Sequence, residues 1–379
     1  MTSSVIVSAA RTPIGGFLGV LSSRSAPELG AVAIKAAVER AGLKPVDIEQ
    51  VIMGCVLQGG LGQSPARQAA LGAGLPKETG VLTVNKVCSS GLVAIMLADQ
   101  MIRLGEATTV VAGGMESMSR APYILPRGRE GYRMGHGQVT DMMIHDGLWD
   151  VYNNFHMGRE RQDDFAMESY ARAQRAMKEG WFNDEIVPVA IPGRKGETTN
   201  VTADEEPMKF DPAKFRSLKP VFEKDGTITA GNASSISDGA AAVVVMTEEE
   251  AKRRGCTVLG RIVAHGAASQ APEWFTTAPE KAIAKVLERS QLKPNDIDLF
   301  EINEAFSCVA LRAIDALRLD PKKVNAHGGA VALGHPIGAS GARLIATLLH
   351  AMKRYEAKRG LASLCNGGGE ATAMILEQP

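Results

Sequence analysis

The sequence predicts a layered α/β fold with helices on both sides of mixed β-sheets. Forty glycines occur in short clusters that alternate with runs of Ala, Val and Ile, as expected for tight turns between buried strands and small-residue helices. Hydrophobic residues make up 45% of the chain and charged residues 22%, which is typical of a soluble protein with a well-buried core. Because 379 residues exceed one ordinary core, we expect two packed units.

Local patterns place the individual elements. Strands covered on both faces are predicted where β-branched residues and alanines are flanked by glycine, at residues 5–7, 108–112 and 241–246. Helices are predicted from their hydrophobic periodicity at residues 26–41, 91–104, 279–290 and 339–355.

A weak internal repeat indicates two related halves. Cys88 opens a predicted helix, which is followed by a strand and by a glycine turn, a glutamate and a methionine within residues 112–118. His335 also opens a helix, and a strand and the segment 367–374 follow with glycine, glutamate and methionine in the same order. We therefore expect pseudo-symmetric halves whose helix N-termini meet at the centre.

The charge and cysteine content argue against a nucleic-acid partner, a disulfide framework and a metal site. Lys plus Arg equals Asp plus Glu, at 42 each, so no overall field attracts nucleic acid, and we expect no nucleic-acid partner. The five cysteines are odd in number and widely scattered, which favours a reducing compartment over a disulfide framework. No spacing of Cys and His suits zinc, so we expect no metal site.

The N-terminal residues lead directly into a predicted strand, without a basic leader or an apolar stretch suited to a signal peptide. No apolar run approaches the length needed to cross a bilayer, so we expect no membrane association. These features favour a cytoplasmic location, although an organellar location with a leader removed before Met1 stays open.

Two stretches depart from the regular alternation. Residues 121–158 are rich in Gly, Met, His, Arg and Tyr with little periodicity, and residues 197–225 are charged and contain proline. Long ordered excursions from a compact core usually carry binding or assembly surfaces, and we expect that use here.

Four segments carry side chains suited to acyl chemistry. Cys88 lies where a strand ends and a helix begins, so the positive end of the helix dipole favours its thiolate. His335, held between Gly and Pro at a helix entrance, can serve a cysteine as a base. Cys365 stands just before the glycines 367–369, whose N–H groups can face a developing oxyanion. Asn303 brings a carboxamide into an apolar segment, where a buried amide needs a partner.

Each of these residues alone has an ordinary structural explanation, but the set does not. In this order, Cys88, the sequence Asn-Glu-Ala-Phe at 303–306, Gly-His-Pro at 334–336 and Cys365 with its glycines resemble the thiolase family. The resemblance runs from residue 10 to residue 371. It implies two pseudo-symmetric halves that form a five-layered α/β/α/β/α core, plus a loop domain.

The resemblance also implies a domain order. The N-terminal core half, with Cys88, takes residues 1–118 and resumes at 231–255. The loop domain, with tetramerisation and CoA-binding excursions, takes residues 119–230. The C-terminal core half, with the remaining catalytic residues, takes residues 256–379. We expect a homotetramer or dimer of dimers.

By this resemblance, Cys88 attacks a thioester and carries the acyl group, and His335 takes the thiol proton. Cys365 moves the α-proton of the second thioester or returns a proton to the leaving group. Asn303, through a water, joins His335 in holding the thioester oxygen of the incoming acetyl group, while the N–H groups of Cys88 and Gly367 form a second oxyanion hole. No cofactor is implied, because the coenzyme A (CoA) thioesters are the substrates.

Weaker assignments concern CoA and acyl-CoA. His156 and Met157 resemble the pair that short-chain biosynthetic thiolases place beside the acyl group and pantetheine, and Ser234 resembles a serine that contacts the pantetheine arm. The remaining expected substrate or CoA contacts are Leu148, Lys209, Lys214, Ala230, Ala305 and Phe306. Of these, the two lysines fall where related enzymes bring basic side chains near the nucleotide phosphates, although lysines are usually solvated surface charges.

One departure from the family pattern bears on the choice among three hypotheses about the function. Relatives continue after His-Met-Gly with a helical stretch of roughly a dozen residues, whereas Gly158 here leads directly into Arg159, a loss of roughly 20 Å of helix. In the leading hypothesis, the protein joins two acetyl-CoA molecules reversibly into acetoacetyl-CoA and CoA. The alternatives are a broader-chain 3-ketoacyl-CoA thiolase of fatty-acid degradation and a non-catalytic acyl-CoA binder left by the shortened loop.

Overall fold

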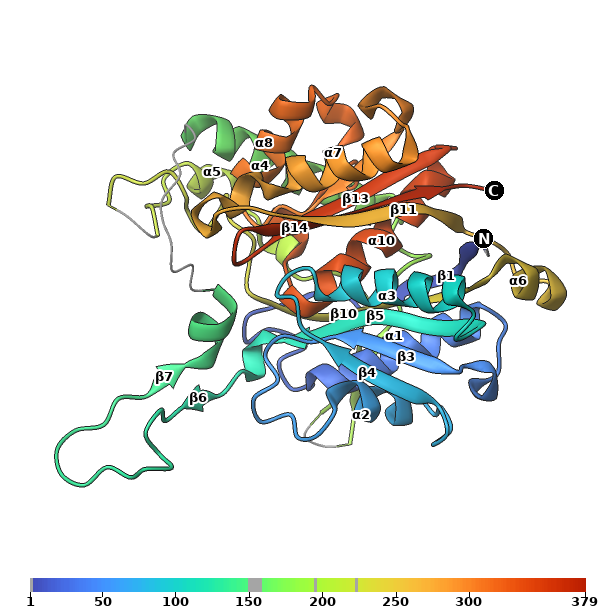
Figure 1. Ribbon diagram of the computed structural model, residues 1–379. Coiled ribbons are helices and arrows are strands. Elements are labelled where there is room, and N and C mark those ends of the chain that lie inside the picture. The colour runs from blue at the N-terminus through green and yellow to red at the C-terminus, as the bar shows by residue number, and fades with distance from the viewer. Residues whose placement is uncertain (1–2, 149–158, 194–195, 222–223) are drawn as a thin grey trace.

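The computed structural model of the protein describes residues 3–148, 159–193, 196–221 and 224–379. Its core is a mixed ten-stranded sheet that divides into two layers, one per half of the chain (Figure 1). The predicted α/β class, with helices on both sides of mixed sheets, is confirmed.

In the N-terminal half the strands lie in the order β1, β10, β5, β3, β4. Strand β3 pairs in parallel with β4 and β5, and β10 runs antiparallel between β5 and β1. The bounds of these strands and of the short β2 beside β10 are β1 Ser4–Arg11, β2 Gly15–Gly16, β3 Gln50–Gly54, β4 Gly80–Val84, β5 Thr109–Ser117 and β10 Ser237–Thr247.

The C-terminal half repeats this order as β11, β14, β13, β12. Here β12 and β13 are parallel, β14 is antiparallel to both neighbours, and a parallel bridge from Phe300 to Val324 takes the place of β4. The strands are β11 Gly260–Ser269, β12 Leu299–Ile302, β13 Arg359–Asn366 and β14 Glu370–Glu377. The halves join where β1 meets β11, and the predicted pseudo-symmetry is confirmed.

Helices complete five layers (Figure 1). Apolar side chains of α1 and α2 cover the outer face of the N-terminal sheet, those of α7 and α8 cover the outer face of the C-terminal sheet, and α3 and α10 lie between the sheets. Their bounds are α1 Ala26–Arg40, α2 Pro65–Gly72, α3 Ser90–Leu104, α7 Ala278–Ser290, α8 Ser307–Leu317 and α10 Ile337–Arg354. The four predicted helices are confirmed to within two residues at each end.

Glycines bring the two central helices together. A Cβ on Gly341 would lie 2.3 Å from the backbone nitrogen of Leu92, and one on Gly91 would lie 2.8 Å from that of Ala342. Only a residue without a side chain permits such contact, so the first turns of α3 and α10 touch, backbone against backbone.

The central helix α3 corrects one expectation. The stretch Val87–Leu104 has the length and the mean hydropathy, 1.4, of a helix that could cross a membrane. The prediction that no apolar run approaches that length was therefore wrong. Half of this stretch is buried inside the protein. An apolar helix packed between two sheets passes the same test of length and composition, because it too is covered on most sides.

The predicted glycine turn at residues 112–114 was also wrong. These residues lie inside β5 and form no turn, whereas their supposed counterpart at 367–369 does connect β13 to β14. A Cβ on Gly114 would lie 2.1 Å from the carbonyl oxygen of Gly338. Glycine is needed there so that the first turn of α10 can lie against the strand.

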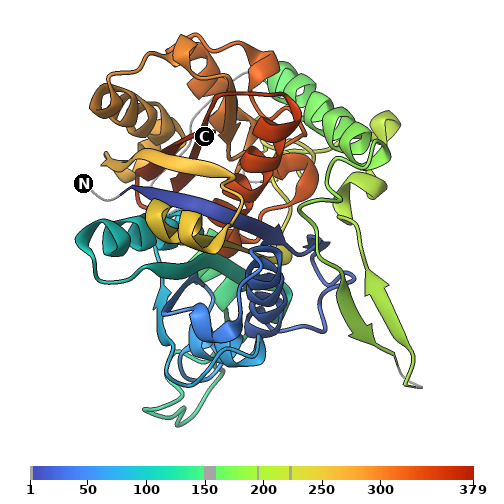
Figure 2. The same ribbon diagram turned by 90° about the vertical axis from the view of Figure 1, so that its right-hand side faces the viewer.

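The remaining elements belong mostly to the excursions. The hairpin β6–β7 stands on an arm that projects from the body in Figure 1, and Figure 2 shows β8 and β9 extending along the flank. The bounds are β6 Tyr123–Ile124, β7 Thr140–Asp141, β8 Val189–Pro192, β9 Thr198–Val201, α4 Arg159–Lys178, α5 Pro212–Phe215, α6 Glu248–Arg254 and α9 Ala330–Leu333. A π-helical segment, η3, spans Met143–Leu148.

Candidate active site

Cys88 lies in the short turn between β4 and α3, beside Val87, whose positive φ of 47° marks a strained backbone. Burial raises the pKa of the Cys88 thiol to about 11, and the negative charge of Glu116 acts in the same direction. The backbone N–H groups of Gly367 and of Cys88 itself hydrogen-bond the sulfur and oppose this rise. The resting nucleophile is therefore a thiol with two donors already in position.

Cys365 lies at the end of β13 and is 1% exposed, packed in an apolar cluster with Ala305, Cys308 and Val309. Burial raises the pKa of its thiol well above the ordinary value, and negative charge on Cys88 raises it further. Ser89, next to Cys88, hydrogen-bonds Asn366, next to Cys365, so the two cysteines lie in one region of the protein.

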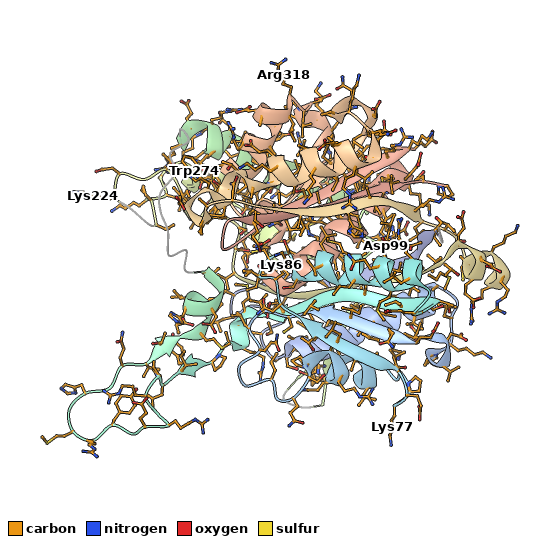
Figure 3. All side chains as sticks on the ribbon, in the orientation of Figure 1. Lys77, Lys86, Asp99, Lys224, Trp274 and Arg318 are labelled. Atoms are coloured by element: carbon orange, nitrogen blue, oxygen red, sulfur yellow. The ribbon has the colours of Figure 1, made fainter. Side chains whose placement is uncertain are left out.

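Polar contacts tie the two cysteine segments together. The Ser89 hydroxyl donates to Asn366 Oδ1 at 2.8 Å and accepts from the Thr372 hydroxyl at 3.0 Å. Lys86 forms an ion pair of 2.5 Å with Glu370. Lys86 lies at the N-terminal end of α3 in Figure 3, between the two sheet layers, so these bonds hold the halves together beside the nucleophile.

His335 and Asn303 meet at the same place. The Nε2 atom of His335 lies 3.4 Å from Asn303 Nδ2, and its Nδ1 atom lies 2.6 Å from Ser340 Oγ. Burial lowers the pKa of His335 to about 3, and the positive charge of Arg343 acts in the same direction. The imidazole is therefore neutral at physiological pH and available as a proton acceptor.

The fold explains why these side chains converge. β12 and β13 are parallel, so their carboxyl ends lie at one edge, where Asn303 follows β12 and Cys365 ends β13. The Asn303 N–H donates to the Ser363 carbonyl at 2.9 Å, which sets this register. The N-termini of α3 and α10, next to Cys88 and His335, lie at that edge, because Ser89 binds Asn366 at the end of β13 and His335 contacts Asn303.

Gly334 and Asn303 each show how the site is arranged for a ligand. Gly334 has a φ of 104°, and a Cβ there would lie 2.4 Å from Ser237 Oγ, so glycine alone lets the backbone reach His335 in this geometry. Asn303 is fully buried, and its Oδ1 atom has no hydrogen-bond partner among the described residues. A buried amide oxygen without a partner is costly, and a water or substrate group would satisfy it.

Several expected CoA contacts adjoin this region. The Ser234 hydroxyl and backbone N–H both donate to the Ala305 carbonyl, at 2.9 and 3.0 Å, and Phe306 is bridged to the neighbouring Ala233. Ser234 is half-buried, so its side chain reaches solvent beside the Asn303 segment. Ser234, Ala305 and Phe306 are thus brought together next to the catalytic candidates.

Four of the other expected contacts lie at the surface of the protein. Lys209 forms ion pairs with Glu205 and Glu206 at 3.0 and 2.8 Å, and Lys214 lies 3.3 Å from Asp211. Their charges are already balanced locally, as is usual for surface lysines. Ala230 and Leu148 are exposed. His156 and Met157 lie outside the described residues.

Two residues that line this centre escaped the sequence analysis. Glu116 is fully buried and accepts from the N–H groups of Val56, Leu57 and Gly338 at 2.9 to 3.1 Å, so it joins β5 to the first turn of α10. Burial raises the pKa of Glu116 to about 7. Ser340 touches His335. The only sequence signal for Ser340 was its place in the glycine-rich helix entrance after His335.

Comparison with known proteins identifies the family of this chain. Residues 4–249 match the model of the thiolase N-terminal domain, and residues 256–378 match that of the thiolase C-terminal domain. This chain belongs to the thiolase family.

Relatives of this thiolase span its whole length. It is 52% identical to an acetyl-CoA acetyltransferase of Cupriavidus necator, with 100% of both chains covered, and 51% identical to acetyl-CoA acetyltransferase 2 of Arabidopsis thaliana, with 98% and 96% covered. Its fold resembles the crystal structure of the Acat5 thiolase from Ascaris suum in complex with coenzyme A, with a TM-score of 0.93, 43% identity and full coverage of both chains. The five-layered thiolase fold is thereby confirmed, and the chain is an acyltransferase.

The length of one alignment shows that this thiolase lacks some positions of a relative. The alignment with the Cupriavidus necator enzyme runs over 394 positions, more than the 379 residues present here, so some positions of the relative have no residue in this thiolase. In the structure, α4 begins at Arg159, where the described chain resumes.

Among the described residues no group of three or more His, Cys, Asp or Glu side chains is arranged to hold a metal ion.

Proposed function

We propose that this thiolase condenses two acetyl-CoA molecules to acetoacetyl-CoA and CoA in a reversible reaction. The observation that carries the proposal is the convergence of the Cys88 sulfur, its N–H donor Gly367, the buried Cys365 and the His335–Asn303 pair at one edge of the C-terminal sheet. The relatives at about half identity are named acetyl-CoA acetyltransferases, which supports acetyl as the acyl group.

In the first half-reaction the Cys88 sulfur attacks the thioester carbonyl of acetyl-CoA. With the thiol pKa near 11 and the imidazole pKa near 3, a free thiolate–imidazolium pair is disfavoured in the empty site. The thiol proton therefore moves to His335 Nε2 as the carbon–sulfur bond forms. The bond from carbon to the CoA sulfur breaks, Cys365 protonates that sulfur, and CoA leaves an acetylated Cys88.

In the second half-reaction the Cys365 thiolate removes an α-proton from a second acetyl-CoA. The enolate oxygen is held by a water bound to Asn303 and by the proton on His335, because such a weak carbon acid needs directed donors. The enolate carbon attacks the acetyl carbonyl, whose oxygen faces the N–H groups of Cys88 and Gly367. Cys88 then leaves and recovers its proton from His335, and acetoacetyl-CoA is released with all atoms accounted for.

Covalent labelling tests this function. Wild-type protein incubated with acetyl-labelled acetyl-CoA is expected to retain label after denaturation, and Cys88→Ser is expected to retain none. Acetoacetyl-CoA should accumulate when CoA is removed continuously. A wild type that binds acetyl-CoA but retains no label would contradict the proposal and favour the non-catalytic binder, which no observation here supports.

Chain length is tested separately. Thiolysis of acetoacetyl-CoA is compared with thiolysis of six- and eight-carbon 3-ketoacyl-CoA substrates at equal CoA concentration. A steep fall in kcat/KM beyond four carbons is the expected outcome. Equal rates across the series would instead assign the protein to broad-chain thiolysis.

We also propose that the protein assembles as a homotetramer, a dimer of dimers, through its projecting arm. Apolar side chains stand exposed along the arm, among them Tyr123, Leu125, Met134 and Val139. Exposed apolar groups gathered on one thin element are typical of a surface that another chain covers. CoA and acyl-CoA are the small-molecule partners.

A further inference from the structure

The hydroxyl of Ser340 makes a contact that the mechanism above does not use. Its oxygen lies 2.6 Å from Nδ1 of His335, and both side chains are buried, with His335 5% exposed and Ser340 1% exposed. Ser340 lies in the first turns of α10, on the same helix whose entrance holds His335. The contact is therefore as rigid as the helix itself.

A second hydrogen bond of Ser340 favours one direction for this contact. A serine hydroxyl has one hydrogen, and that of Ser340 is directed at the carbonyl oxygen of Pro336 at 3.0 Å. When this bond to Pro336 forms, the Ser340 oxygen accepts from His335, and the hydrogen of the neutral imidazole is on Nδ1. This leaves Nε2 as the acceptor.

The other side of the ring requires the same arrangement. Asn303 approaches Nε2 with its Nδ2 group at 3.4 Å, and an amide NH2 can only donate. Two neighbours on two elements thus favour the same tautomer. Because His335 is neutral in this site, the choice between its two tautomers decides whether the nitrogen facing Asn303 can accept a proton at all.

We propose that Ser340 is a positioning residue that holds His335 in the Nδ1–H tautomer, so that Nε2 can take the proton of the Cys88 thiol. The inference rests on the proposed function, since it assigns how the base of that reaction is prepared. A hydroxyl orients the ring as a carboxylate does in a serine-protease triad, but it adds no charge that would stabilise the imidazolium. His335 therefore remains a weak base that releases its proton again when Cys88 leaves.

The first test reads the tautomer in the wild-type protein. In a sample with 15N-labelled histidine, the signals of His335 are those missing from a His335→Asn variant. The expected spectrum shows Nδ1 protonated and Nε2 unprotonated between pH 6 and 8. A protonated Nε2 in this range would overturn the inference even if every variant fails to fold.

The second test uses Ser340→Ala with Ser340→Thr as the conservative variant. A positioned base contributes about 10²–10⁴-fold, and we expect Ser340→Ala to lose about ten- to a hundredfold in the rate of Cys88 acetylation and in kcat, with KM for acetyl-CoA changed less than about twofold. Ser340→Thr keeps the hydroxyl and should restore most of the rate.

A matched control separates this role from helix stability. Ser290 also donates to the carbonyl four residues earlier, at 2.8 Å, but lies in α7 away from the site, so Ser290→Ala should leave acetylation unchanged. Acetylation of Ser340→Ala at the wild-type rate would refute the inference. A wild type that is itself never acetylated would refute the proposed function instead, so the two failures are distinguishable.

Discussion

At the scale of single residues, the reactivity of the site depends on two opposed pKa shifts. Burial raises the pKa of Cys88 to about 11 and lowers that of His335 to about 3, so both groups are neutral in the resting protein. A neutral pair costs little to bury, whereas a thiolate and an imidazolium would each have to be desolvated. The charge develops only during reaction, next to the donors that wait for it.

The first prediction concerns the pH dependence of Cys88. Because the folded-state pKa lies above that of an ordinary thiol, the thiolate fraction at neutral pH is small. Alkylation of Cys88 by iodoacetamide should therefore rise about tenfold per pH unit between pH 7 and 10. The rate is measured by mass spectrometry of the peptide that contains Cys88.

The same peptide alkylated in denaturant is the control, and its rate should level off about two units earlier. In the folded protein, a rate that levels off below pH 9 would mean that the donors from Cys88 and Gly367 outweigh burial. A plateau below pH 7 would make the thiolate the resting form at neutral pH.

At the scale of elements, the meeting of α3 with α10 forms the site. Cys88 precedes one helix and His335 the other, and Gly91 and Gly341 let the two first turns touch. Glu116 extends this arrangement, because it binds the N–H of Gly338 in the first turn of α10. A small displacement between the helices would separate the nucleophile from its base, and such a misplacement is costly in catalysis.

The second prediction tests this packing with Gly341→Ala. Alanine favours a helix over glycine by about 1 kcal/mol, so a loss of stability can only come from the neighbour. The added Cβ would meet the Leu92 backbone nitrogen at 2.3 Å, and we expect the free energy of unfolding to fall by about 1–3 kcal/mol. Chemical denaturation measures this change, and kcat should fall with it.

Gly72→Ala in α2 is the matched variant, since its Cβ would meet only the methyl group of Ala31 at 3.1 Å. This change should be close to neutral. Equal stability of the two variants would show that α3 and α10 can separate without cost.

At the scale of the whole molecule, buried charges connect the core to the loop region. Arg11 on β1 is 1% exposed and binds Glu185 at 2.6 Å and Asp204 at 2.7 and 2.9 Å. The two carboxylates raise the pKa of the Arg11 guanidinium further above its ordinary value, against the effect of burial. Both partners lie near residue 200, far from Arg11 in the sequence.

The third prediction is the loss of this connection in Arg11→Met. Two carboxylates would be left in the interior without a cation, so the free energy of unfolding should fall by about 3–5 kcal/mol. Arg253→Met breaks the ion pair with Glu250, in which Arg253 is 65% exposed, and should cost at most about 1 kcal/mol. Thermal melting compares the two variants, and similar losses would contradict the importance of burial.

The fourth prediction concerns assembly. Met134 on the arm is 99% exposed, and replacing it with glutamate brings a charge into the proposed interface. Met134→Glu should convert tetramers into dimers by light scattering while the melting temperature stays unchanged. Val46→Glu, at a residue 73% exposed on the body, should leave the tetramer intact. Tetramers of Met134→Glu would remove the arm from the assembly.

Much of this protein was determined by the sequence alone. The strands and central helices follow from periodicity and glycine placement, which are local properties, and the four predicted helices end where expected. The thiolase family was identified from residues at Cys88, 303–306, 334–336 and Cys365, because the chemistry restricts those positions. The pattern at 112–114 failed, since glycine marks a turn and a close helix–strand contact equally well.

The tertiary structure decided the rest. That Ser340 touches His335, that Ser89 bonds with Asn366 and Thr372 and that Glu116 binds the N–H of Gly338 could not be predicted. Most of these contacts join residues on different elements, and their distances depend on how whole layers pack. The pKa values follow the same rule, because burial, which the sequence does not show, is the largest cause of the shifts at both Cys88 and His335.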